Sequence, residues 1–320
     1  MKIVLLTYVN RSGSTYLANL LSASDDICVC PEGDLLVSLF LESPGKAFRL
    51  DKHRRTKLVK LIQSDSKLKY WGVGDDIFNI LEDADSNIVA FLAFLHYYQL
   101  NQKPEASCIL FKAERLADLF SAIENSRGSG NTFKYLSIIR DPRGVYESQR
   151  RTQVPGTGRS MSSNPVYTAI YWNHHIRAIL KCRKHIDCYQ ILYNDFIWKM
   201  DEVIRTLSIY LGLDLKGITA VEGDLSERLP DSHRLIHQTI SDIPLQEKID
   251  EWRKELNQEE ISLIERKCKR YFGEFGFVAS RTDHYVPAIT CKMNYYSGLY
   301  QTVQNIRKAR FHLKRIFKLA

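Results

Sequence analysis

A short stretch near the N-terminus combines the residue types that bind phosphate. Arg11–Thr15 reads RSGST and follows an apolar run, Lys2–Val9, that predicts a buried strand. Leu17, Leu20 and Leu21 then recur at helical spacing, which places RSGST on the turn between a strand and a helix. The first amides of a helix lack intrahelical partners, and the helix dipole adds positive charge there. The stretch therefore predicts an anion-binding loop.

The loop differs from that of the nucleoside-triphosphate enzymes. Their pattern, G-x-x-x-x-G-K-[ST], supplies a lysine that this chain lacks. No good acidic metal site follows a later strand either. We therefore expect no metal, and a magnesium-dependent P-loop-like kinase stays only as an alternative.

A second stretch carries the same kind of chemistry. Tyr135–Ile139 predicts a strand that ends at Arg140, and Asp141 and Pro142 suit the cap and first turn of a helix. Ser148 lies two turns into that helix. Because Arg140 and Ser148 can reach one anion near the sheet's edge, the two stretches together predict a ligand with two phosphate sites.

The elements that position these residues alternate between strand-like and helical patterns. This alternation predicts crossover units around a parallel sheet, an α/β fold with helices on both faces. In such a sheet, ligands bind beyond the carboxyl ends of the strands. The expected strands are Lys2–Val9, Ile27–Val29, Ser107–Lys112, Lys134–Ile139 and Cys188–Tyr193. We expect one domain over residues 1–280, with a helical cap insertion at 43–100, and a basic extension over 281–320.

The two phosphate stretches resemble the 5′-phosphosulfate loop and the 3′-phosphate motif of the carbohydrate and tyrosylprotein sulfotransferases. Two later segments, ILYNDFIWKMDEVIRTLSIYLGL and IDEWRKELNQEEISLIERKCKRYFGEFGF, are similar to further family segments, so the resemblance spans Met1 to Val278. The family's Tyr-Glu-Asp-Leu reads Tyr193-Asn194-Asp195-Phe196 here, and the tail after Val278 has no counterpart. The resemblance implies a P-loop-NTPase-like three-layer fold and 3′-phosphoadenosine 5′-phosphosulfate (PAPS) as donor.

The resemblance also implies roles for individual residues. Arg11 would stabilise the leaving group, helped by donors from the rest of the loop. Arg140 and Ser148 would hold the 3′-phosphate, and Tyr193 would contact the donor. The loop donors are Ser12, Gly13, Ser14 and Thr15.

Glu32 is the candidate general base. The short strand Ile27–Val29 ends just before it, so Glu32 is expected at the carboxyl edge of the sheet, beside the first loop. Several relatives have their proposed catalytic glutamate in the matching stretch. Lys112 ends another strand on the same side and is expected to touch substrate or sulfate. A pair in a helical run, His174 and His175, is expected to be structural or to line the acceptor.

Charge points to an anionic acceptor. The net charge is +8, yet no zinc-finger, RNP or basic-zipper pattern is visible, so nucleic acid is not expected. Residues 150–165 read as a loop carrying Arg150, Arg151 and Arg159, with the last two as substrate contacts. A hydroxyl or amine of a polysaccharide or glycolipid fits best. A protein-tyrosine acceptor and a non-catalytic polyanion-binding protein remain alternatives.

The last stretch, 298–320, is a basic amphipathic candidate. It either lies on an anionic membrane surface or packs on the domain with its basic face in solvent. The seven cysteines have irregular spacing and read as free thiols in a reducing compartment. With a strand that begins at residue 2, the expectation is a cytoplasmic protein, peripheral to the inner membrane if the tail binds lipid.

Overall fold

The computed structural model describes residues 1–32, 49–63, 68–72, 76–114, 116–125, 130–218, 246–280, 291–302 and 305. The position and charge of His233, Arg234 and His237, before Trp252, predict a loop that closes over the donor; these residues lie outside the described ranges, as do the tail residues 306–320. Within the described ranges, no helix has the length and apolar character needed to cross a membrane.

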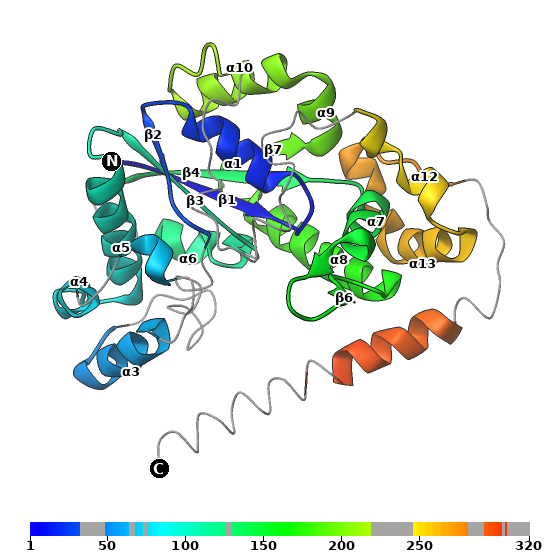
Figure 1. Ribbon diagram of the computed structural model, residues 1–320, viewed down its shortest axis with the longest axis horizontal. Coiled ribbons are helices and arrows are strands. Elements are labelled where there is room, and N and C mark those ends of the chain that lie inside the picture. The colour runs from blue at the N-terminus through cyan, green and yellow to red at the C-terminus, as the bar shows by residue number, and fades with distance from the viewer. Residues whose placement is uncertain are drawn as a thin grey trace.

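A five-stranded parallel sheet forms the centre of the molecule (Figure 1). Its spatial order is β2-β3-β1-β4-β7, which places β1 between β3 and β4. The strands are β1 (Lys2–Tyr8), β2 (Ile27–Val29), β3 (Cys108–Glu114), β4 (Thr132–Ile139) and β7 (Cys188–Leu192). All five lie within one or two residues of the predicted runs, because strands buried on both faces read as continuous apolar stretches.

Helices cover both faces of the sheet, as predicted (Figure 1). Along β1, Val4 and Leu6 point to one core, while Ile3 and Leu5 point to the other. The first core is closed by α1 (Ser14–Ser22), α9 (Tyr193–Trp198) and α10 (Met200–Leu211). The second is closed by α5 (Asn87–Gln102), α6 (Phe120–Asn125), α8 (Pro165–Cys182) and α13 (Gln258–Cys268).

The remaining described elements surround these layers. Three of them precede α5: α3 (Lys52–Gln63), η1 (Leu68–Trp71) and α4 (Ile77–Glu82). The others are η2 (Leu116–Asp118), α7 (Pro142–Arg151), η4 (Gln246–Ile249), α12 (Trp252–Glu255) and η5 (Lys269–Phe275). In α5, Phe91 lies edge-on to Phe111 of β3, with ring centres 5.5 Å apart, so this helix is part of the second core.

The stretch 150–165, predicted as a loop, is not irregular throughout. Arg150 and Arg151 form the last turn of α7, and two short strands then pair antiparallel as β5 (Gln153–Val154) and β6 (Arg159–Ser160). The loop prediction was wrong here because glycine and proline mark the turn of a hairpin as readily as they mark a loop. Asn164 then caps α8 by accepting from the amides of Val166 and Tyr167.

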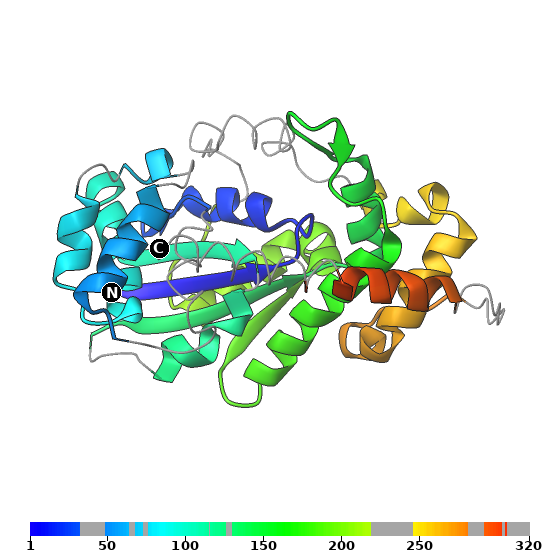
Figure 2. The same ribbon diagram turned by 90° about the horizontal axis from the view of Figure 1, so that it is seen from below.

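The described part of the C-terminal region begins with a helical stretch, 291–302, that contacts α8 and α13 (Figure 2). The Tyr300 ring lies edge-on to Tyr167, with centres 5.3 Å apart. Lys267 Nζ donates to Ser297 Oγ at 3.1 Å. These contacts place the start of the tail against the second layer of helices.

Candidate active site

The loop after β1 has a sharply turned backbone. Arg11 has a φ of 73° and Gly13 a φ of 85°, both in the left-handed region, and α1 begins directly afterwards at Ser14. A Cβ at Gly13 would lie 2.8 Å from Cε2 of Tyr193, so only glycine fits between the loop and that ring. The sequence predicted a turn here, but neither its left-handed backbone at Arg11 nor its contact with α9.

The loop after β4 lies directly beside it. β1 and β4 are paired neighbours, with Tyr8 opposite Ile138, so the two predicted phosphate stretches converge at one edge of the sheet. Arg140 Nη1 donates to the Arg11 carbonyl at 2.9 Å, and Arg11 Nε donates to Ser148 Oγ at 3.1 Å. Residues 137 positions apart are thereby joined within one site.

The Arg140 side chain is held from several directions. Its guanidinium carbon lies 4.5 Å from the centre of the Tyr193 ring, and Nη2 donates to the Lys248 carbonyl at 3.3 Å. On α7, Gly144 leaves the space beside it, since a Cβ there would lie 3.1 Å from Arg140 Nε. Trp172 of α8 donates to the Arg140 carbonyl at 2.9 Å. The site thus draws on four elements besides the loop.

The electrostatics of this corner favour an anion. Burial lowers the pKa of Arg11, and the nearby positive charge of Arg140 lowers it further. Two guanidinium groups this close repel one another unless negative charge lies between them. In the part of the chain that the structure describes, buried Ser12 Oγ and Arg140 Nε have no hydrogen-bond partner. Buried donors without a partner, beside the neighbouring guanidinium groups of Arg11 and Arg140, fit a ligand with two anionic groups.

A second cluster lies on the β2 and β3 side of the loop. Lys112 Nζ donates to Glu32 Oε1 at 2.6 Å and to Thr15 Oγ1 at 3.1 Å. Tyr8, the last residue of β1, donates its hydroxyl to the same Glu32 oxygen. The Lys112 side chain is buried, and Glu32 is 15% exposed. Two predicted residues, Glu32 and Lys112, are therefore in direct contact and reach the anion loop through Thr15.

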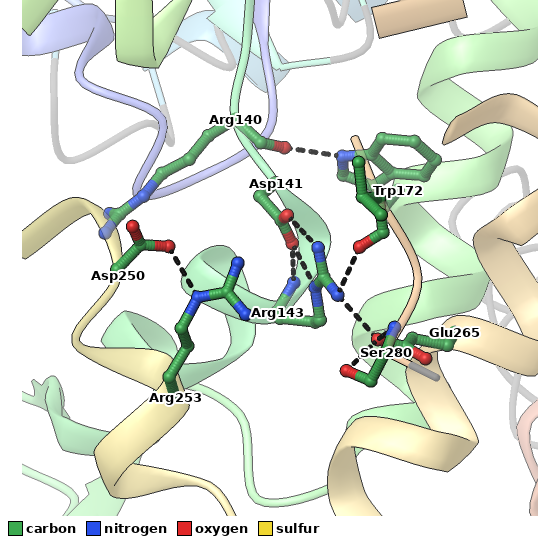
Figure 3. Close-up of polar contacts among 9 residues, drawn as sticks. Arg140, Asp141, Arg143, Trp172, Asp250, Arg253, Glu265 and Ser280 are labelled. Carbon is green, nitrogen blue, oxygen red and sulfur yellow. Dashed lines mark hydrogen bonds and ion pairs between the residues drawn. The ribbon is translucent and has the colours of Figure 1, made fainter. Parts of the chain in front are cut away.

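A third cluster lies behind Arg140 and fastens the C-terminal segment to α7 (Figure 3). Arg143 is buried and donates to both Asp141 oxygens, at 2.9 and 2.5 Å, and to Glu265 Oε1 at 2.5 Å. Ser280 donates to that same Glu265 oxygen at 2.9 Å. The Arg143 guanidinium also lies 3.9 Å from the Trp252 ring centre. Although it directly follows Arg140, Asp141 and Pro142 in the chain, Arg143 bonds to carboxylates of the protein itself.

The two arginines predicted to touch the acceptor, Arg151 and Arg159, make other contacts than the residues of these clusters. Arg151 pairs with Glu147 and, at 2.7 Å, with Glu251, so two carboxylates already balance its charge. Arg159 is exposed on β6. The structure does not bring either residue to Glu32, and their contact with an acceptor stays a prediction.

Several residues at the site carried no signal in the sequence. Tyr8, Trp172 and Gly144 sit within ordinary strand and helix patterns, and their roles depend on partners far along the chain. Of the three, Tyr8 alone lies near the end of a predicted strand, one residue before Val9 and the anion loop.

Comparison by sequence finds no matching family model and no matching curated protein. Solved structures do resemble the fold. The sulfotransferase domain from the curacin biosynthetic pathway has a TM-score of 0.58 at 16% identity, covering 87% of this chain and 99% of that one. The sulfotransferase domain from the Synechococcus PCC 7002 olefin synthase has a TM-score of 0.60 at 16% identity, covering 88% and 96%. Across nearly the whole length of both domains, the chain has the sulfotransferase fold.

Proposed function

We propose that this chain is a sulfotransferase that moves a sulfuryl group from PAPS to a hydroxyl or amine of a glycan acceptor, a polysaccharide or glycolipid. The observation that carries the proposal is the convergence of the β1 and β4 loops. Arg11, Ser148 and Arg140 form a continuous set of contacts across the two strand ends. The likeness to sulfotransferase domains supports the same reaction class.

The residues around the two loops fit a donor with phosphate at both ends. Arg140 and Ser148 would hold the 3′-phosphate, and Arg11 with the amides of Gly13 and Ser14 would hold the 5′ end. PAPS, when bound, supplies the sulfuryl group and a phosphate leaving group. Preorganised positive charge and amide donors at a leaving oxygen often supply the largest single catalytic effect.

Glu32 is proposed as the base that takes the acceptor's proton. Its contact with Lys112 keeps a cation beside the carboxylate, which favours the ionised form that a base needs. Thr15 links this pair to the first turn of α1, so the carboxylate is positioned relative to the anion loop. Tyr193, stacked on Arg140, would contact the donor from the opposite side.

The acceptor is proposed from charge and surroundings. Because Arg151 is paired with Glu147 and Glu251, attraction of an anionic glycan would depend more on exposed Arg159. A second carboxylate, Glu114, lies at the C-terminal end of β3, near Tyr8 and Glu32. The two similar domains are named for a biosynthetic pathway and an olefin synthase, so an acceptor screen with labelled PAPS should include small-molecule hydroxyls beside glycan and lipid extracts.

Donor binding is tested by thermal shift with three ligands: 3′,5′-bisphosphoadenosine (PAP), ATP with magnesium, and heparin. We expect PAP alone to stabilise strongly, by about 2.7 kcal/mol at 100 times its dissociation constant. Arg140→Met should weaken PAP binding about 10- to 100-fold, whereas Arg183→Met, at the end of α8, should not. Preference for ATP with magnesium would instead favour a kinase, and response to heparin alone a polyanion-binding protein.

The base is tested by comparing two carboxylate variants at the same edge. Glu32→Gln should keep PAP affinity and lower turnover about 10²- to 10⁴-fold. Glu114→Gln is the matched comparison, since Glu114 also accepts from a tyrosine, Tyr171, at 2.5 Å. Unchanged turnover in Glu32→Gln together with loss in Glu114→Gln would move the role to Glu114.

A further inference from the structure

The hydroxyl of Tyr8 is an unassigned polar group in contact with the proposed base. Tyr8 is buried at the end of β1 and donates to Glu32 Oε1. The same oxygen accepts from Lys112 Nζ at 2.6 Å. A carboxylate oxygen that accepts two hydrogen bonds, one of them from a cation, is fixed in position and favours the ionised state.

Tyr8 acts in this contact as a donor. Its pKa is raised well above the ordinary value, first by burial and then by the negative charges of Glu32 and Glu114. The phenol therefore stays protonated through the working pH range of most enzymes. The phenol keeps its proton and donates it in the hydrogen bond to Glu32 Oε1, so Tyr8 does not compete with Glu32 as a base.

The groups that face Tyr8 come from three elements. β3 contributes Lys112, whose Nζ lies 5.1 Å from the Tyr8 ring centre, and Glu114, which is opposite Tyr8 in the strand register. α8 contributes Tyr171, whose hydroxyl donates to Glu114. Glu32 follows β2. Tyr8 thus donates to Glu32 and Tyr171 donates to Glu114, and Lys112 forms an ion pair with Glu32.

We propose that Tyr8 is a positioning residue for the reaction: its hydroxyl and the Lys112 ammonium together fix Glu32 Oε1 and keep the carboxylate ionised before the acceptor arrives. The catalytic part of this statement rests on the proposed function. The hydrogen-bonding part stands on the contacts alone, and the two parts have separate tests.

The first test uses no turnover. Tyr8→Phe removes only the hydroxyl, and the Glu32 carboxyl is followed by carbon NMR in protein labelled at the glutamate side-chain carboxyl, with Glu32→Gln to assign the signal. In Tyr8→Phe the Glu32 titration should move to higher pH, because the carboxylate loses a hydrogen-bond donor. An unchanged titration would overturn the proposal.

The second test is the pH dependence of sulfate transfer. In Tyr8→Phe the acid limb of kcat should move up by the same amount as the Glu32 titration, with PAP affinity unchanged. Tyr146→Phe is the matched control, because it removes another buried phenol, one that donates to Glu260 at 3.1 Å. A merely structural role for Tyr8 would lower kcat at every pH without moving the limb, and that result would contradict the proposal.

A second substitution covers the case in which Tyr8→Phe does not fold. With 3,5-difluorotyrosine incorporated at position 8, the hydroxyl remains and donates more strongly, so the Glu32 titration should move down. No movement would overturn the proposal. If the unaltered protein transfers no sulfate while the Glu32 titration responds to position 8, the proposed function fails and the contact's effect on Glu32 stands.

Discussion

Gly13 is the residue on which the shape of the anion loop depends most directly. Its φ of 85° is costly for any residue with a Cβ, and a Cβ would also meet the Tyr193 ring at 2.8 Å. Gly13→Ala should therefore lower the free energy of unfolding by more than about 2 kcal/mol, or displace Tyr193 and weaken PAP binding. Urea denaturation and PAP titration measure the two effects.

Gly156 provides the control for Gly13. Its φ is 73°, but among the described residues no atom beyond its two chain neighbours lies within 4 Å of the position a Cβ would take. Gly156→Ala should show the backbone cost alone, about 1–2 kcal/mol, with PAP affinity unchanged. Equal effects of the two substitutions on stability and on PAP binding would show that contact with Tyr193 contributes nothing.

His175 makes stability depend on pH. It is buried in α8, neither ring nitrogen has a hydrogen-bond partner among the described residues, and burial lowers its pKa to about 3. The unfolded chain takes up a proton near pH 6.5, whereas the folded chain does not until about pH 3. Stability is therefore fully present above pH 6.5 and is lost as pH falls towards 3, by about 2 kcal/mol at pH 5.

The test compares two neighbouring histidines. His175→Leu should flatten the dependence of the free energy of unfolding on pH between 7 and 4, whereas His174→Leu, at an exposed position, should change it much less, since the His174 charge is the smaller cause of the lowered His175 pKa. Chemical denaturation at several pH values measures both slopes. An unchanged slope in His175→Leu would assign the acid sensitivity to other groups.

Between elements, Arg143 is a buried link from α7 to the segment 246–280 (Figure 3). It joins Asp141, at the start of α7, to Glu265 of α13, and it donates to the Val278 carbonyl at 3.0 Å. Because Arg143→Met would leave two largely buried carboxylates without their cation, we expect a loss of about 3–5 kcal/mol in the free energy of unfolding.

The contrast for Arg143 is an exposed pair in the same segment. Arg253 pairs with Asp250 at 3.0 Å, and both side chains are more than half exposed. Arg253→Met should change stability by less than about 1 kcal/mol. If the two methionine variants unfold at the same urea concentration, Arg143 does not hold the segment to α7.

At the scale of the whole molecule, we propose that the basic tail binds anionic membrane surfaces. Contacts of the stretch 291–302 with α8 and α13 place its start on the domain. Six basic residues follow between positions 307 and 318. We expect the protein to sediment with vesicles rich in anionic lipid but not with neutral ones, with a contribution of about 1 kcal/mol per basic side chain near the surface.

Salt and charge provide the controls for the tail. Binding to anionic vesicles should fall steeply as salt rises, because the attraction is screened within a Debye length. Substitution of Lys314 and Arg315 by glutamine should weaken binding, while Lys181→Gln on α8 should not. If the variant at Lys314 and Arg315 binds anionic vesicles as well as the Lys181→Gln variant does, the tail is not the part of the protein that contacts the membrane.

The sequence by itself determined the parallel-sheet architecture and the placement of the two arginine-bearing loops at adjoining strand ends. Apolar runs buried on both faces of a parallel sheet, and helices with capped ends, are local features. The strands and the start of α7 at Asp141 were therefore predictable. Arg11 and Arg140 were predictable for the same reason, since strand ends are where such a sheet binds ligands.

Only the tertiary structure decided which side chains meet. The stack of Tyr193 on Arg140, the role of Arg143 behind the site, and the shared oxygen of Glu32 each join residues distant in the chain. The ion pairs of Arg151 with Glu147 and Glu251, and the hairpin formed by β5 and β6 after it, are likewise visible only in the tertiary structure. Such contacts depend on strand order and helix packing, which local residue patterns do not encode.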